Sequence, residues 1–250
     1  MSVHSRGRIC LWEGGSLWIG ETTGEIEPHA HHAVQLTLSF GDDFRFEADG
    51  RVVTGRAAMV ASDVLHAFRA KGEIAHLFVE PESRIGRALL AAFCAEAPVS
   101  LLPQAVLQDA ADALARAWRD GAADDRLVEL AKAAFGALAP AVEQASAPDA
   151  RVREVIEWVS ENVSEPLSLE GAAEIAGLSP GRTRHLFVQE TGVAFRSYVL
   201  WLRLMRAVRR YAEGAPLTEA AYDAGFADSA HLSRTFRRMF GTPASALRMA

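Results

Sequence analysis

The chain has 250 residues, of which 50% are hydrophobic and 23% charged, so it can form a sizeable core and wholesale disorder is excluded. Its apolar runs, such as Ala88–Ala92, are too short to cross a bilayer, and the first residues lack a signal-peptide pattern, so we expect no membrane association. The two distant cysteines, Cys10 and Cys94, exclude a disulfide framework and a cysteine-rich zinc site, and a cytoplasmic location is expected.

The net charge of −6 hides an uneven distribution. Residues 1–150 carry 13 basic and 21 acidic side chains, whereas residues 179–250 carry 11 arginines and 5 acidic side chains. Such asymmetry favours a C-terminal part that binds an anionic partner, although a solvated arginine-rich surface gives the same pattern.

The first eighty residues have the pattern of short β-strands. In Val34–Phe40 apolar side chains alternate with Gln35, Thr37 and Ser39, which is the period of a strand with one buried face. Turn residues such as Gly14-Gly15 and Asp49-Gly50 separate the runs. The pattern predicts an antiparallel sandwich or small barrel with strands at Ile9–Glu13, Ser16–Gly20, Val34–Phe40, Phe44–Ala48, Arg51–Val60, His66–Ala70 and Ile74–Glu80.

Alanine- and leucine-rich segments with helical spacing follow this region. They predict three helices, at Ser83–Ala97, Pro103–Arg119 and Asp124–Ala145. The apolar stripes of these helices suit two roles, a dimer surface or a cap on the sheet. The segment Gln144–Ala150 has the composition of a linker, and from Arg151 onward the pattern is helical.

An internal repeat is the strongest feature of the C-terminal part. Ala173–Ser179 is echoed 48 residues later by Ala221–Ala227, with a conserved pattern of small residues and a glycine in each copy. Each copy is typical of a helix-turn-helix, since Gly177 and Gly225 stand where the first helix must end and turn. Ser179 is the expected cap of the second helix in copy one.

The second helix of each copy has an apolar back and a basic front. Arg182, Arg184 and His185 are expected to point outward in the first copy, and His231, Arg234, Arg237 and Arg238 are expected outward or flanking in the second. Arginine binds guanine edges and phosphates, so such helices suit the DNA major groove. A single helix over Phe195–Ala212 would hold both units, so that the two helices enter successive grooves about 34 Å apart.

The stretch from about Val152 to Arg248 resembles the DNA-binding domain of AraC/XylS-family transcription regulators. The resemblance is carried by Ala173–Ser179, Glu190-Thr191-Gly192, Leu202-Arg203-Leu204, Ala224–Ser229 and Phe236–Pro243. It implies two helix-turn-helix units that bind promoter half-sites. It also implies base-facing positions at Gly181, Arg182, Arg184 and His185 in copy one, and at Ser229, His231, Ser233 and Arg234 in copy two.

The N-terminal region resembles a cupin sensor domain, which commonly precedes this DNA-binding domain in the family. The resemblance is carried by Gly24, by His29-x-His31-x3-Gln35 and by His66. It implies a divalent transition metal on His29, His31, Gln35 and His66, where residues 29, 31 and 35 share a face if they lie on one regular strand. An organic effector in a polar pocket is the other expectation.

Taken together, we expect an α+β protein: a cupin-like antiparallel barrel or sandwich at 1–82, a helical hairpin or dimerisation region at 83–147, and an all-α double helix-turn-helix domain at 148–250. The expected function is a non-enzymatic DNA-binding transcription regulator that senses a small molecule or metal. The expected partners are promoter DNA, a second copy of the chain and RNA polymerase. The alternative is a metal-dependent cupin enzyme with an appended DNA-binding module.

Overall fold

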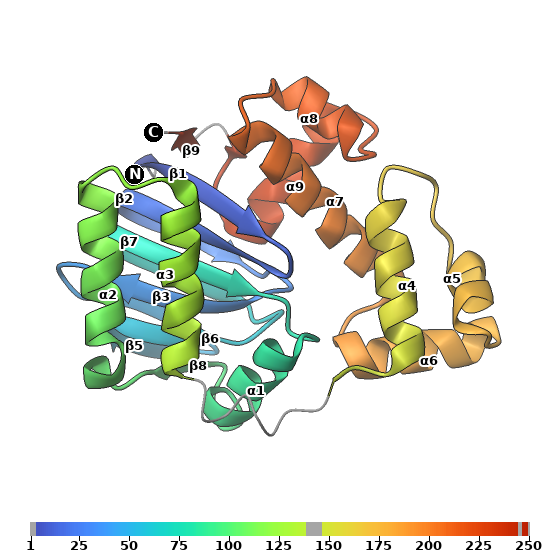
Figure 1. Ribbon diagram of the computed structural model, residues 1–250, viewed down its shortest axis with the longest axis horizontal. Helices are drawn as coiled ribbons and strands as arrows, with labels where there is room; N and C mark the ends of the chain where they lie inside the picture. Colours follow the sequence, from blue (N-terminus) through green and yellow to red (C-terminus); the bar gives the residue numbers. More distant parts are fainter. Residues whose placement is uncertain (1–3, 139–146, 245–246, 250) are drawn as a thin grey trace. The chain divides into compact units, whose positions relative to one another are not determined.

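The computed structural model describes residues 4–138, 147–244 and 247–249 (Figure 1). Residue contacts divide the chain into two compact units, one of Met1–Ala145 with Phe236–Ala250 and the other of Ser146–Thr235. The expected linker up to residue 146 and the end of the helix expected to reach Ala145 lie outside the described residues. The division at 1–82, 83–147 and 148–250 stays a prediction.

Nine strands of the described chain form one sheet in the first unit, in the order β8-β6-β3-β7-β2-β1-β9, and β4 pairs with β5 and β7. All pairings are antiparallel except that of β1 with β9. The strands are β1 His4–Trp12, β2 Gly15–His29, β3 Val34–Ser39, β4 Phe44–Ala48, β5 Arg51–Gly55, β6 Ala57–Val60, β7 His66–Val79, β8 Val99–Leu101 and β9 Leu247–Met249.

The sheet is buried on both faces. In β3 the apolar residues Leu36 and Leu38 belong to one core cluster. Gln35 and Thr37, which alternate with them along the strand, are buried on the opposite face. A second cluster, built around Phe46 and other phenylalanines, fills that opposite side. The predicted alternation of β3 is therefore confirmed, but the prediction of one buried face is wrong, because its polar face turns inward toward a pocket.

Several strand predictions are wrong in their bounds. The first strand begins at His4 instead of Ile9, and β2 continues past the predicted end at Gly20 to His29, because it pairs with β7. The segment 66–79 is one strand, since Lys71 and Gly72 pair with β2 instead of forming a turn. Arg51–Val60 is divided at Arg56 into β5 and β6. The C-terminal residues Leu247–Met249, expected to be helical, form β9, because their backbone pairs with the edge strand β1.

Three helices cover one face of the sheet: α1 Arg84–Phe93, α2 Gln104–Arg119 and α3 Asp124–Ala137 (Figure 1). Their buried residues, such as Leu114 and Leu127, belong to the same core cluster as Leu36 and Leu77 of the sheet. The apolar stripes thus form a cap on the sheet. That the chain forms a homodimer stays a prediction, as does the expected contact with RNA polymerase.

The second unit is helical. Its helices are α4 Ala150–Glu161, α5 Leu169–Ala176, α6 Pro180–Thr191, α7 Phe195–Ala212 and α8 Leu217–Asp223, followed by α9 Ser229–Phe240, whose last five residues belong to the first unit. Val155, Phe187 and Tyr198 lie in its core. Every helix within the described ranges falls short of the length and apolar character needed to cross a membrane.

Candidate functional site

The first helix-turn-helix unit is formed by α5 and α6. Gly177 ends α5 with a left-handed φ of 62°, a conformation that glycine adopts without strain. Ser179 then caps α6, because its hydroxyl accepts a hydrogen bond from the Arg182 backbone N–H at 3.4 Å, and Pro180 follows at the first position. The local sequence therefore sets both the turn and the start of the second helix.

The outer face of α6 is basic, as expected. Arg182, Arg184 and His185 are exposed, whereas Thr183 and Phe187 are buried. No ion pair involves Arg182 or Arg184 within the part of the chain that the structure describes. These guanidinium groups are thus available to a phosphate or a base edge.

The second helix-turn-helix, formed by α8 and α9, has the same arrangement with a different capping residue. Gly225 makes the turn with a φ of 76°, and the Asp228 carboxylate accepts a hydrogen bond from the His231 backbone N–H at 2.6 Å. Leu232 and Phe236 are buried on the inner side of α9. Asp228, rather than Ser229, therefore caps α9.

The expected DNA-facing residues of α9 differ in what they contact. Arg234 and Arg238 are exposed, while Ser233 is half-buried and donates its hydroxyl to the Ser229 carbonyl at 2.8 Å. The half-buried His231 ring packs edge-on against a phenylalanine. Arg237 pairs with Glu27, with Nη2 and Oε2 2.9 Å apart, so a phosphate would have to compete with that carboxylate for it.

The helix α7, which lies between the two helix-turn-helix motifs in the chain, has the bounds predicted for it. Arg203 on α7 donates to the Val163 carbonyl at 2.9 Å, and Arg210 pairs with Asp223 of α8 at 2.9 Å. These arginines therefore have structural partners, which reduces the number of cations available to DNA on α7.

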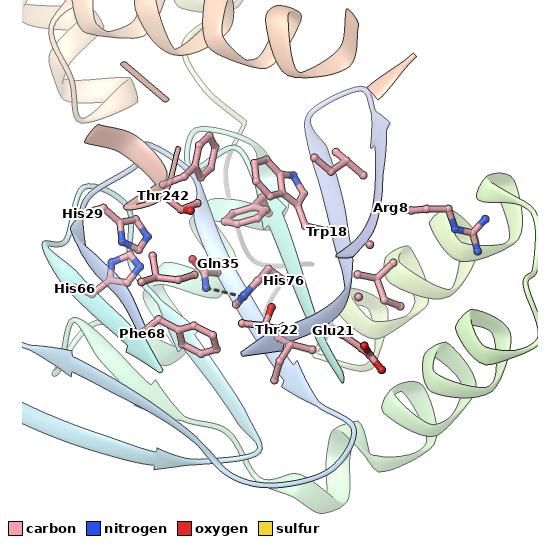
Figure 2. A pocket seen from close by; sticks show the side chains of 18 residues that line it. Arg8, Trp18, Glu21, Thr22, His29, Gln35, His66, Phe68, His76 and Thr242 are labelled. Carbon is pink, nitrogen blue, oxygen red and sulfur yellow. Dashed lines mark hydrogen bonds between the residues drawn. The ribbon is translucent and has the colours of Figure 1, made fainter. Parts of the chain in front are cut away.

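The compact unit that contains the sheet has a pocket on the inner face of the sheet. The empty volume of this pocket is about 750 Å³, including the part open to solvent. Its wall is mostly apolar and aromatic, and its polar lining consists of three histidines, a glutamine, two threonines, an arginine and a glutamate (Figure 2). Of the expected metal ligands, His29, His66 and Gln35 line it. His76, Phe240 and Thr242 also line it, and no motif in the sequence indicates this position for them.

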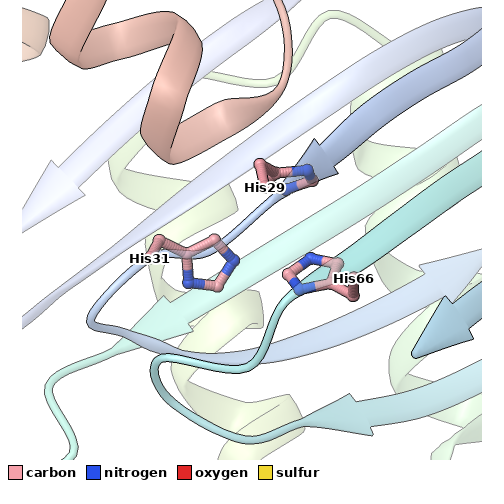
Figure 3. A group of neighbouring side chains, drawn as sticks. All are labelled: His29, His31 and His66. Carbon is pink, nitrogen blue, oxygen red and sulfur yellow. The ribbon is translucent and has the colours of Figure 1, made fainter. Parts of the chain in front are cut away.

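Three of the expected metal ligands come together. One ring nitrogen from each of His29, His31 and His66 lies within 4.8 Å of the others, and all three side chains are buried (Figure 3). The expectation that residues 29, 31 and 35 lie on one strand is wrong, because β2 ends at His29 and β3 begins at Val34. The loop between the strands carries His31 into the cluster.

The orientation of the three imidazole rings is fixed by backbone carbonyl groups. Each Nδ1 lies beside a carbonyl oxygen two residues away: 2.8 Å to Glu27 for His29, 3.0 Å to Ala33 for His31 and 2.9 Å to Val64 for His66. A neutral imidazole beside such an acceptor carries its proton on Nδ1, which leaves the Nε2 lone pair for another partner. The His66 Nε2 atom is buried and has no hydrogen-bond partner among the described residues.

Burial holds the pocket histidines in the neutral form. Burial, together with a smaller effect of neighbouring histidines, lowers the pKa of His29 to about 4 and that of His76 to about 3. Burial also lowers the pKa of His31 and of His66. Neutral imidazoles are the form that binds metal ions.

Gln35 lies beside the cluster and contacts one of its rings. Its amide oxygen is 2.8 Å from His31 Nε2, and its amide nitrogen is 2.8 Å from Thr37 Oγ1 and 3.0 Å from His76 Nδ1. An amide has both a donor and an acceptor, so it can match either protonation state of a ring nitrogen. Gln35 therefore positions His31 and links it to His76.

The adjacent His32 has a different environment. Burial opposes its charged form, but hydrogen bonds with Asp63 at 3.3 Å and Glu82 at 3.1 Å outweigh it and raise the pKa of His32 to about 9. A protonated ring between two carboxylates is a structural ion pair and lacks a lone pair for a metal.

The comparisons with known proteins bear on both units. Residues 172–250 match a helix-turn-helix domain model. The chain is 36% identical to the transcriptional activator RhaS of Escherichia fergusonii over 37% of this chain and 34% of that protein. It is 28% identical to the multiple antibiotic resistance protein MarA of Escherichia coli K12, over 39% of this chain and 78% of MarA.

The likeness to a solved structure extends over both units. ToxT of Vibrio cholerae O395 matches with a TM-score of 0.60 over 98% of this chain and 94% of ToxT, at 8% sequence identity, which shows the fold alone. The chain spans about a third of the length of the curated relatives it first matches, among them the uncharacterized regulator YpdC of Escherichia coli K12.

The chain thus combines an antiparallel-sheet unit with two helix-turn-helix motifs, and the helix-turn-helix part is similar to that of known transcription regulators. These matches support the expected resemblance of its C-terminal part to AraC/XylS-family regulators.

Proposed function

We propose that this chain binds promoter DNA sequence-specifically through α6 and α9, and that its sheet pocket senses a small molecule or metal ion. The observation that carries the DNA-binding role is the repeated helix-turn-helix, in which two capped helices each expose arginines without an ion-pair partner among the described residues. The chain acts as a regulator without a catalytic step of its own.

The DNA-binding role is tested with duplexes selected from a random pool by the full chain. Arg184→Ala and Arg234→Ala remove one guanidinium from each recognition helix, and a lost bidentate base contact costs about 1–3 kcal/mol of discrimination. Arg116→Ala on α2 removes an exposed arginine of the first unit and is the matched control. Unchanged sequence preference in both recognition-helix variants would contradict the assignment, while a uniform loss over all sequences would indicate phosphate contacts.

The sensing role rests on the pocket. Its lining by Trp18, Phe68 and Phe78, together with neutral histidines, suits a small molecule with a largely apolar body and a few polar groups. A ToxT structure with an unsaturated fatty acid bound has a TM-score of 0.58 to this chain. For this chain we propose the sheet pocket as the effector site.

The three-histidine cluster supports a divalent transition metal in the same pocket. His29 and His66 fit the ion, because a carbonyl oxygen holds each Nδ1 and leaves a lone pair on Nε2, and His66 Nε2 has no partner among the described residues. His31 would exchange its Nε2 contact with the Gln35 amide oxygen for the ion. His29, His31 and His66 would hold the ion, and the Gln35 amide oxygen, 2.8 Å from His31 Nε2, is the expected fourth ligand. A bound ion would supply a Lewis acid to a ligand in the pocket.

Elemental analysis of the purified full chain tests the metal site. We expect about one ion per chain and a fall below a few tenths in His66→Ala, because three nitrogen ligands are the fewest that protein metal sites of this type use. His185→Ala, which removes an exposed histidine on α6, is the control and should keep the ion. Equal metal content in the His66 variant and the unchanged chain would contradict the site.

A further inference from the structure

The C-terminal segment, Phe236–Ala244, packs in the same compact unit as the pocket. The ring of Phe240 lies 4.5 Å from that of Trp18 and 6.2 Å from that of Phe78 between centroids, and Phe236 stacks on Trp18 at 6.1 Å. Both phenylalanines are buried. The segment thus forms part of the pocket wall, next to the pocket histidines.

Gly241 of this segment lies close to the two atoms whose hydrogen bond orients the His29 ring. Its φ is 66°, and a Cβ added there would overlap the Glu27 carbonyl oxygen and lie 2.7 Å from His29 Nδ1. These two atoms form the 2.8 Å hydrogen bond that fixes the His29 ring. The absence of a side chain at Gly241 therefore lets the backbone of the segment sit directly on that bond.

Thr242 adds a polar atom to the pocket. Its Oγ1 atom is buried without a hydrogen-bond partner among the described residues, as is His66 Nε2, and both residues line the pocket (Figure 2). Buried polar groups are normally satisfied, so two such atoms in one pocket point to an occupant that contacts both. One atom comes from β7 and the other from the C-terminal segment.

We propose that an ion in the three-histidine cluster and the docked C-terminal segment stabilise each other. The ion fixes the His29 ring against Gly241, and an oxygen ligand that completes its coordination, from water or from a carboxylate or hydroxyl group in the pocket, bonds to the Thr242 hydroxyl. This inference rests on the metal site proposed above. Because α9 begins with DNA-facing candidates and ends in this segment, the ion constrains the last turns of that helix.

Zn²⁺ alone is the probe, with the full chain. Hydrogen–deuterium exchange of the backbone amides in Phe236–Ala244 is measured with and without saturating Zn²⁺. We expect slower exchange in this segment when the ion is bound, because the ion removes conformations in which the segment is undocked. His66→Ala, which lacks a ligand, should show no such change.

The reciprocal effect is measured as the Zn²⁺ dissociation constant, by competition with a coloured chelator. Gly241→Ala should raise the constant about tenfold, since coupling between two sites acts equally in both directions. Thr242→Val, which keeps the shape of the side chain, should raise it several-fold. Gly214→Ala is the matched control, because Gly214 also has a left-handed φ, of 93°, but its added Cβ meets open space, so the constant should stay within about twofold.

Two results overturn the inference in different ways. If the unchanged chain binds one Zn²⁺ but exchange in the segment and the constants of Gly241→Ala and Thr242→Val stay the same, the metal site stands and the coupling does not exist. If the unchanged chain binds no Zn²⁺, both the metal site and the coupling are wrong. The exchange measurement on the unchanged chain decides the matter even if one of the variants fails to fold.

Discussion

At the scale of single residues, Gly177 and Gly225 hold equivalent places in the two helix-turn-helix units but have different surroundings. Both have a left-handed backbone, with φ of 62° and 76°. A Cβ added at Gly177 would meet open space, whereas one added at Gly225 would lie 2.9 Å from the Cα and the carbonyl oxygen of Ser164. The repeat in the sequence thus conserves a backbone conformation, while the second copy also requires the small size of glycine.

This difference predicts unequal costs of substitution. Gly177→Ala should lower the free energy of unfolding by about 1 kcal/mol, because the left-handed region disfavours a Cβ. Gly225→Ala should lower it by about 2–4 kcal/mol, because the overlap with Ser164 adds to that strain. Urea denaturation followed by circular dichroism measures both values, and equal losses would contradict the close approach.

Gln35 is the most connected polar side chain of the pocket. Gln35→Leu would leave His31, Thr37 and His76 without the amide that contacts them, so we expect a loss of about 1–3 kcal/mol in the free energy of unfolding. Gln104→Leu, at an exposed site on α2, is the control and should change stability by less than about 0.5 kcal/mol. A loss in the control as large as in Gln35→Leu would show that the network contributes nothing.

At the scale of elements, the predictions succeeded where a pattern is local. The bounds of α7 follow from one apolar stripe, and the cap at Ser179 follows from a serine next to a turn. The strand β7 differs from its prediction, because pairing with β2 carries it through Gly72, where local preference indicates a turn. The partner strand decides such a case, and it lies some fifty residues earlier in the chain.

The cap of α2 and α3 on the sheet makes a further prediction. Leu114→Ala should lower the free energy of unfolding by about 2–5 kcal/mol, because Leu114 is fully buried in the cluster shared by helices and sheet. Val106→Ala on the same helix removes a side chain that is 47% exposed and should cost less than about 1 kcal/mol. Chemical denaturation tests this, and similar losses would place the stripe outside the core.

At the scale of the whole molecule, the charge is divided along the chain. Residues 1–150 are acidic in sum, and the arginines of α6 and α9 stand in the arginine-rich region from 179 to 250. Because DNA repels the acidic part, binding must depend on a few cations, which makes the affinity steeply dependent on salt.

This dependence can be measured for one arginine. Arg238→Ala should weaken binding to all duplexes alike and reduce the slope of log K against log salt by about 0.9, the value expected for one lost phosphate contact. Arg116→Ala is again the control and should leave the slope unchanged. If Arg238→Ala changes the sequence preference but not the slope, Arg238 contacts a base instead.

The candidate site shows how far a sequence can lead at this scale. His29, His31 and His66 are apparent from their pattern, and the structure brings them together. Thr242 and Phe240 carry no such pattern, because they reach the pocket from the opposite end of the chain. Their role depends on long-range packing, which no local spacing encodes.

The border between the two compact units crosses α9 between Thr235 and Phe236, inside a continuous helix. A fragment that starts after the expected linker, made for crystallisation or spectroscopy, lacks Trp18. The Phe236 and Phe240 rings, which pack against Trp18 in the full chain, would then be exposed to water. Such a fragment should be prone to self-association, and replacing both rings with polar side chains is the rational way to keep it monomeric.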